Sequence, residues 1–229
     1  VAAALAAYES VLKLKPDYNA AALNLVELYS VLHDDQGGDK AKAELYATKL
    51  EEMDEIFGSK ARLLIMPEDT DEVEYWKKVL DSHEGNAAVL EELGKAYMGT
   101  EMIEDCVACF EKAVAADPAY STLFLDLGRY YVMTTWRDAS KEEMTMPASE
   151  KAINRYLESD PLTPLKAFSM GLLAKVKRGM KDEEGAKEIA VKANEIDAYY
   201  SKAFAIPPLV LFEHPAKVSL SHKYMLRPF

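Results

Sequence analysis

Cysteine is scarce in this chain, whose 229 residues include only Cys106 and Cys109. Two cysteines are too few for a disulfide framework and too few to indicate a redox compartment. Their C-x-x-C spacing could supply half of a zinc site or a redox centre, but a second pair is missing from the sequence and we expect both residues in the middle of a helix. A packing role is therefore predicted for Cys106.

Positive charge is also in short supply. Lysine and arginine total 27 against 39 aspartates and glutamates, which gives a net charge of −12. A deficit of cations works against binding to a phosphate backbone, because such binding depends on the release of counterions by lysine and arginine. Nucleic acid is not expected as a partner.

Long apolar runs are missing too. The strongest run, Ile206 to Phe212, is interrupted by Pro207 and Pro208. It is far shorter than the roughly 20 residues that a membrane-spanning helix needs. We expect no membrane insertion.

The chain begins with Val1 rather than Met, and its first helical segment looks like the second half of a repeat. We expect the sequence to start inside a longer protein, so an N-terminal targeting signal could be missing. The cytoplasm is favoured, although the sequence assigns no compartment.

Signatures of catalysis and of metal or cofactor binding are lacking. No G-x-x-x-x-G-K-[ST], G-x-G-x-x-G, G-x-S-x-G or H-E-x-x-H pattern occurs. The acidic stretch from Asp34 to Asp39 lacks the twelve-residue pattern of a calcium loop. The four histidines are expected in solvated or capping roles. We therefore predict no catalytic, cofactor-binding or metal-binding residues, and no enzyme.

What the chain has in quantity is helix-forming residues. Ala, Leu, Glu, Lys and Met are abundant, whereas Val, Ile and Thr are scattered rather than placed in alternating runs. The apolar fraction of 49% is ample for a large core. This composition predicts an all-α fold.

One stretch, Ala87 to Tyr120, carries a regular pattern. Its marked positions are Leu90, Leu93, Gly94, Tyr97, Cys106, Phe110, Ala113 and Pro118. Small residues suit points where two helices cross closely, large ones fill the space between helices, and proline stops the second helix. The pattern therefore predicts a pair of packed helices.

This spacing resembles the tetratricopeptide repeat, with Leu90 where that family usually has Trp. The resemblance implies a right-handed α-solenoid of antiparallel helix pairs, with about five degenerate repeats. Another relaxed type of α-solenoid remains the alternative. Stacked pairs bury a continuous core, which favours one elongated domain.

Weaker copies flank the best one. Phe124, Leu127, Gly128 and Tyr131 repeat the first-helix pattern 34 residues later (128 − 94 = 34). The repeat domain is assigned to residues 1–198, with an insertion at about 132–148, and residues 199–229 are assigned to a capping or extension segment. The other helices are expected at 40–56, 59–66, 71–82 with a cap at Thr70 or Asp69, 164–178 and 182–196.

In the tetratricopeptide family the first helix of each pair lines the concave surface. Transferring the register to this chain implies the partner-binding residues Asn24, Glu27, Glu91, Glu92, Lys95, Asp126 and Arg129. The carboxylates outnumber the cations, so a basic or mixed-charge peptide is preferred. The clamp with which one subgroup grips acidic chaperone tails is not reproduced, because Glu91 and Glu92 would repel such a ligand.

A further candidate contact is Trp136. The segment from Thr134 to Pro147 also contains Met144 and Met146, an apolar content unusual for the loop expected there. We predict a contact surface at Trp136.

The sequence thus favours a non-enzymatic scaffold that binds a peptide or protein. A self-assembling homo-oligomer is one alternative, in which the tail or an open repeat end covers another copy. An accessory repeat region of a longer enzyme or regulator is the other.

Overall fold

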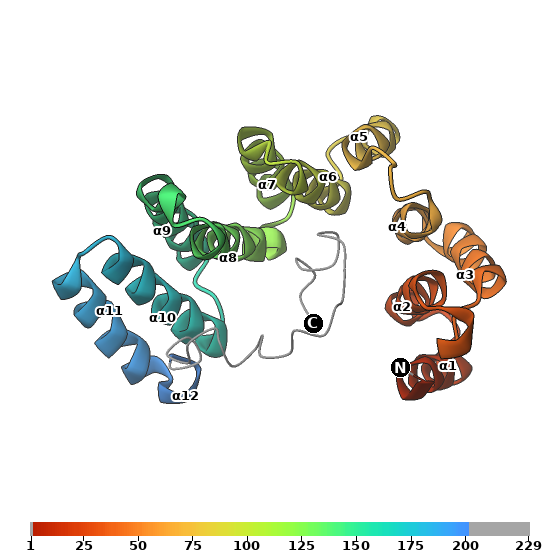
Figure 1. Cartoon of the computed structure of the whole chain (residues 1–229), viewed down its shortest axis with the longest axis horizontal. Helices are drawn as coiled ribbons and strands as arrows, with labels where there is room; N and C mark the ends of the chain where they lie inside the picture. The colour runs from red at the N-terminus through yellow and green to blue at the C-terminus, as the bar shows by residue number, and fades with distance from the viewer. Residues whose placement is uncertain (1, 202–229) are drawn as a thin grey trace. The chain divides into compact units, whose positions relative to one another are not determined.

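The computed structural model describes residues 2–201, and within this range every regular element is a helix, with no strand. The all-α fold predicted from the sequence is confirmed. The helices are α1 (Ala2–Leu14), α2 (Asn19–Val31), η1 (Asp34–Gln36), α3 (Lys40–Met53), α4 (Glu55–Ile65), α5 (Glu72–Ser82), α6 (Ala87–Gly99), α7 (Ile103–Ala116), η2 (Pro118–Ser121), α8 (Thr122–Arg137), η3 (Ala139–Lys141), α9 (Glu142–Leu157), α10 (Thr163–Gly179), α11 (Glu183–Ile196) and α12 (Ala198–Ser201) (Figure 1). Most of the predicted capping segment, residues 202–229, lies outside the described residues.

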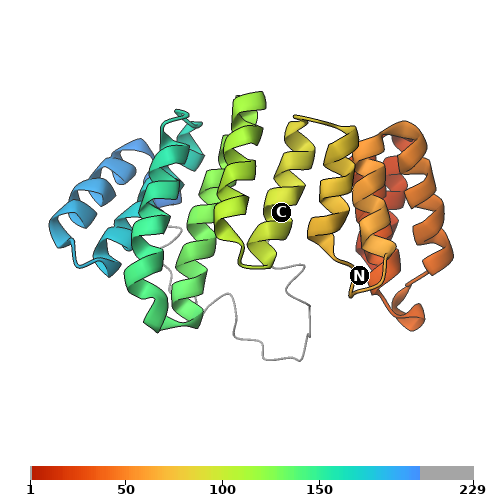
Figure 2. The same cartoon turned by 90° about the horizontal axis from the view of Figure 1, so that it is seen from above.

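The chain divides into two compact units, and the boundary falls inside α7, between Cys109 and Phe110. Within each unit, helices that follow one another in the chain mostly pack side by side, and Figure 2 shows that their directions alternate. Short connections favour this antiparallel packing.

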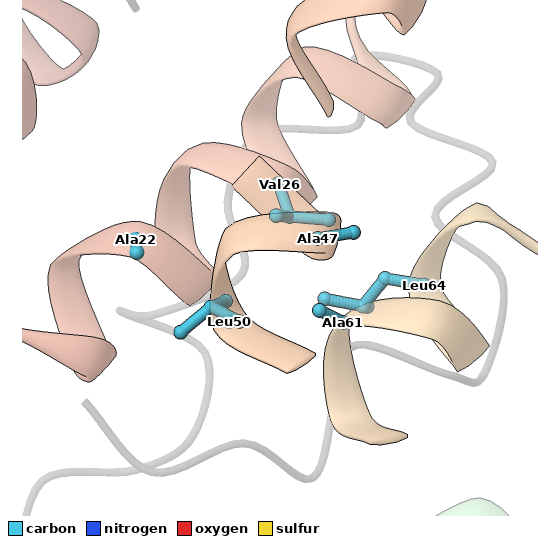
Figure 3. Packing of buried hydrophobic residues seen from close by; sticks show 6 residues of the cluster. All are labelled: Ala22, Val26, Ala47, Leu50, Ala61 and Leu64. Carbon is cyan, nitrogen blue, oxygen red and sulfur yellow. The ribbon is translucent and has the colours of Figure 1, made fainter. Parts of the chain in front are cut away.

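The core of unit 1 is built where α2, α3 and α4 meet. Its members are small or aliphatic residues: Ala22, Val26, Ala47, Leu50, Ala61 and Leu64 (Figure 3). Val26, Ala47, Leu50 and Ala61 are fully buried. Alanines at the contacts allow the helix axes to approach closely, and the larger side chains fill the spaces that remain. A neighbouring cluster of Leu5, Leu25, Tyr29 and Ala43 joins α1 to the same helices.

An arginine holds α4 against α3 at the surface of unit 1. Arg62 of α4 donates from Nη2 and Nε to the two oxygens of Glu51 at 2.6 Å, and it also donates to Glu44 and Thr48. A planar guanidinium matches a carboxylate in this bidentate geometry. Hydrogen bonds from Arg62 keep the pKa of Glu51 below its usual value.

Unit 2 includes the close hairpin of α8 and α9. The Ser149 hydroxyl donates to the backbone oxygen of Gly128 at 2.8 Å, and Ile153 packs where a Gly128 side chain would lie. Phe110 and Phe124 meet edge to face, with ring centroids 6.4 Å apart. Glycine at position 128 therefore permits the close approach of α9.

The pattern in Ala87 to Tyr120 corresponds to buried positions. Leu90, Leu93, Gly94 and Tyr97 are buried in α6, and Cys106, Phe110 and Ala113 are buried in α7. The packing role predicted for Cys106 is confirmed by its complete burial. The predicted stop at Asp117-Pro118 is confirmed as well, because α7 ends at Ala116.

Three predictions about helix limits were wrong. The helix expected at 40–56 ends at Met53, because Asp54 is extended and its carboxylate caps α4 by accepting from the amides of Ile56 and Phe57. The next helix, expected at 59–66, therefore starts earlier, at Glu55. The cap of α5 is neither Thr70 nor Asp69 but Asp71, which accepts from the amide of Glu74.

The loop expected between Thr134 and Pro147 is largely helical, which corrects the sequence-based prediction. Helix α8 continues to Arg137, and α9 begins at Glu142 and contains Pro147. The buried hydroxyls of Thr135 and Thr145 hydrogen-bond to each other, and Met146 is buried. Packing of α9 on α8 thus outweighs the local tendency of Pro147 to interrupt a helix.

Candidate functional site

In unit 1 the predicted binding residues of α6 form a compact charged cluster. Asn86 starts the helix by accepting from the amides of Ala88 and Val89. Leu90, Leu93 and Tyr97 are buried. The helical period then places Glu91, Glu92 and Lys95 together on a different part of the helix surface.

A fourth residue of the cluster, Lys60, was not identified from the sequence. Lys95 Nζ lies 2.6 Å from Glu91 and 3.3 Å from Glu92, while Lys60 Nζ of α4 lies 2.9 Å from the same Glu92 carboxylate. The four side chains are between 19% and 28% exposed. Two ammonium groups therefore match two carboxylates in a half-buried network.

The charges in this network are mutually stabilised. Burial raises the pKa of Glu92, but the ammonium groups of Lys95 and Lys60 outweigh it, so the pKa ends below its usual value. Burial lowers the pKa of Lys95, but Glu92 and Glu91 outweigh it and leave that pKa raised. Both groups remain ionised at neutral pH, and a bound peptide would meet a fixed pattern of charges.

The α2 candidates of unit 1 lie on one helical face. Asn24 and Glu27 are both half-buried, and the Asn24 amide donates to the backbone oxygen of Ala20 at 2.7 Å. This bond occupies one of the two donor positions of the amide and leaves the other available.

In unit 2 the candidates Asp126 and Arg129 pair with each other. Arg129 Nη1 lies 3.2 Å from Asp126 Oδ1, one turn apart on α8. The arginine side chain is 46% exposed, so the pair is accessible to a ligand and contributes little to stability.

Trp136 lies near the end of α8, with 44% of its surface exposed. Lys175 Nζ of α10 sits 4.5 Å from the centre of its ring, a cation–π contact that the sequence analysis did not identify. Burial lowers the pKa of Lys175. The pair joins two helices and leaves part of the indole open to solvent.

The two missed lysines have a common explanation. Lys60 lies in the helix expected at 59–66 and Lys175 in the helix expected at 164–178. Both lie outside the residues quoted for the repeat pattern, so that pattern placed neither lysine relative to the other helices. A helical-face analysis of 55–65 would have placed Lys60 beside the apolar residues Ile56, Phe57, Leu63 and Leu64, which marks it as an unusual cation, but its partner on α6 depends on how α4 packs.

Cys106 and His83 both have structural contacts. Cys106 is buried, and burial together with the neighbouring Cys109 raises the pKa of its thiol to about 12. His83 contacts Glu55 at 2.8 Å and the backbone oxygen of Val79 at 3.2 Å. Among residues 2–201 no group of His, Cys, Asp and Glu has the arrangement of a metal site. Over the same residues, no helix is long and apolar enough to cross a membrane.

The chain matches no protein-family model, and no curated protein sequence shows significant similarity to it. Its resemblance to tetratricopeptide repeats therefore rests on the residue pattern alone.

Proposed function

We propose that this chain is a non-enzymatic interaction module of the tetratricopeptide type, a right-handed α-solenoid that holds a peptide or protein partner. The supporting observation is the charged cluster of Glu91, Glu92, Lys95 and Lys60. Its members are half-buried and fixed by ion pairs. The surface can therefore select a partner by charge with little loss of side-chain conformational entropy on binding.

The preferred partner of this surface is a mixed-charge or basic peptide. Lys95 and Lys60 already neutralise Glu91 and Glu92, so a ligand with both signs can exchange pairs with the network without leaving a charge unpaired. Asp126 and Arg129 present the same combination of charges on α8. A purely acidic ligand could pair with Lys95 and Lys60 only by displacing Glu91 and Glu92 and leaving both carboxylates unpaired.

The test is a pull-down in which the full chain, immobilised, captures a partner in stoichiometric amount from cell extract. The test variant is the double change Glu91→Lys and Asp126→Lys. Glu92 stays unchanged because it contacts α4. We expect retention of the partner to fall about tenfold or more, since both attractive charges become repulsive.

The matched control is Glu104→Lys with Glu143→Lys, two exposed carboxylates that give the same change in net charge. It should retain the partner, and circular dichroism should show equal helix content in both variants. Undiminished retention by the Glu91 and Asp126 variant would contradict the proposed surface.

A further inference from the structure

Unit 1 contains a cleft of about 400 Å³ between α1 and α3, on which none of the predicted partner-binding residues lies. Its apolar floor is formed by Leu12, Ala22 and Leu50. Ala22 and Leu50 are buried core residues, whereas Leu12 is only partly buried. Met53, which is 45% exposed, stands at the mouth. A concave site of this size with an apolar floor suits one large side chain of a ligand.

The rim of this cleft is cationic. It carries the ammonium groups of Lys13 and Lys49 and one carboxylate, that of Glu9. Both lysines are exposed, and within residues 2–201 neither has a carboxylate partner. Lys49 is nevertheless held in place, because its Nζ sits 5.3 Å from the centre of the Tyr46 ring.

The single carboxylate of the rim is already compensated. Glu9 accepts a hydrogen bond of 2.6 Å from the Tyr29 hydroxyl and lies 3.8 Å from Lys42 Nζ. Stacking of Tyr29 on Tyr46, with centroids 6.1 Å apart, fixes the wall that carries these groups. The cleft therefore offers uncompensated positive charge in a chain whose net charge is −12.

We propose that this cleft binds an acidic peptide segment that carries one bulky apolar side chain. The apolar side chain occupies the floor at Leu12, Ala22 and Leu50, and carboxylates on either side of it pair with Lys13 and Lys49. The proposal does not depend on the charged residues proposed for α6 or for α8, which favour the opposite charge, so the two proposals can fail separately.

The test uses the full chain labelled with ¹³C at the methionine methyl groups, with the Met53 resonance assigned by Met53→Leu. The probe is the peptide acetyl-Asp-Glu-Phe-Glu-Asp amide. We expect a saturable shift of the Met53 resonance. The Lys13→Glu, Lys49→Glu double variant should weaken binding about tenfold, because two exposed attractions become repulsions.

Three comparisons make the outcome decisive. Lys151→Glu, an exposed lysine of α9, should leave the affinity within about twofold. Replacing the Phe of the probe by Ala should weaken binding, and a probe with Lys in place of every acid should leave Met53 unshifted. The proposal is overturned by an unshifted Met53 at millimolar probe, by equal binding of the basic probe, or by indifference to the double variant.

Discussion

The ammonium of Lys60 lies 2.9 Å from the carboxylate of Glu92, and this ion pair joins α4 to α6 within unit 1. Both side chains are about one fifth exposed, so water screens the pair less than it screens the surface pairs of this chain. Lys95 approaches the same carboxylate from its own helix. The carboxylate thus belongs at once to the candidate binding surface and to the packing of the unit.

Replacing Lys60 by Met should lower the free energy of unfolding by about 1–2 kcal/mol at pH 7, because Glu92 loses one of its two cations. The pKa of Glu92 is lowered in the fold, so its stabilising contribution is present above the unfolded pKa of about 4.3 and is lost as the pH falls through the lowered value. The difference between Lys60→Met and the parent chain should therefore shrink towards pH 3. Urea unfolding followed by circular dichroism at both pH values measures it.

Lys78→Met is the control for this pH dependence, since Lys78 is an exposed lysine of the neighbouring α5. It should change stability little at either pH. An equal loss at pH 7 and pH 3 in Lys60→Met would show that packing, and not charge, joins α4 to α6.

Gly128→Ala should destabilise unit 2 by about 1–3 kcal/mol, although alanine is the better helix former. The added Cβ would lie 2.6 Å from Ile153 Cγ1, and Ser149 holds α9 close through the Gly128 carbonyl. Gly179→Ala provides the comparison, because its Cβ would meet only the flexible ends of two side chains, Met146 at 3.4 Å and Glu142 at 3.6 Å. A stabilised Gly128→Ala variant in thermal unfolding would contradict the close α8–α9 contact.

The two tryptophans should respond differently to acrylamide. Trp76 is 1% exposed and Trp136 is 44% exposed. The Trp136→Phe variant should keep a blue-shifted emission that resists quenching, whereas Trp76→Phe should leave an accessible emission. Lys175→Met in the Trp76→Phe background should change the Trp136 emission, because it removes the ammonium above the ring. Unchanged intensity and wavelength in that variant would argue against the cation–π contact.

The Cys106 thiol should be unreactive in the folded chain. With a pKa of about 12, on the order of one in ten thousand molecules carries the thiolate at pH 8. In a Cys109→Ala variant, Ellman's reagent should titrate no thiol until urea unfolds the chain and then titrate one. Rapid reaction without urea would show that the α7 core opens readily.

Much of the helix pattern is written in short stretches of sequence. The ends of α7 and α11 were predicted closely, because Asp117-Pro118 and the cap Asp182 act on the residues next to them. Burial of Leu90, Gly94 and Phe110 follows likewise from periodicity. These features depend on interactions within one or two turns, which a local pattern records.

The candidate sites depend on contacts that no local pattern records. Pro147 lies inside α9 because packing on α8 compensates for it. Glu92 and Trp136 were identified as candidates, but their partners Lys60 and Lys175 follow from how separate helices pack. The cleft of α1 and α3 likewise exists only when packing brings Lys13 of α1 and Lys49 of α3 to the same site as Ala22 of α2. Residues distant in sequence meet only when the core brings their helices together. The helices could therefore be predicted from the sequence, whereas the charged cluster and the apolar cleft became visible only in the tertiary structure.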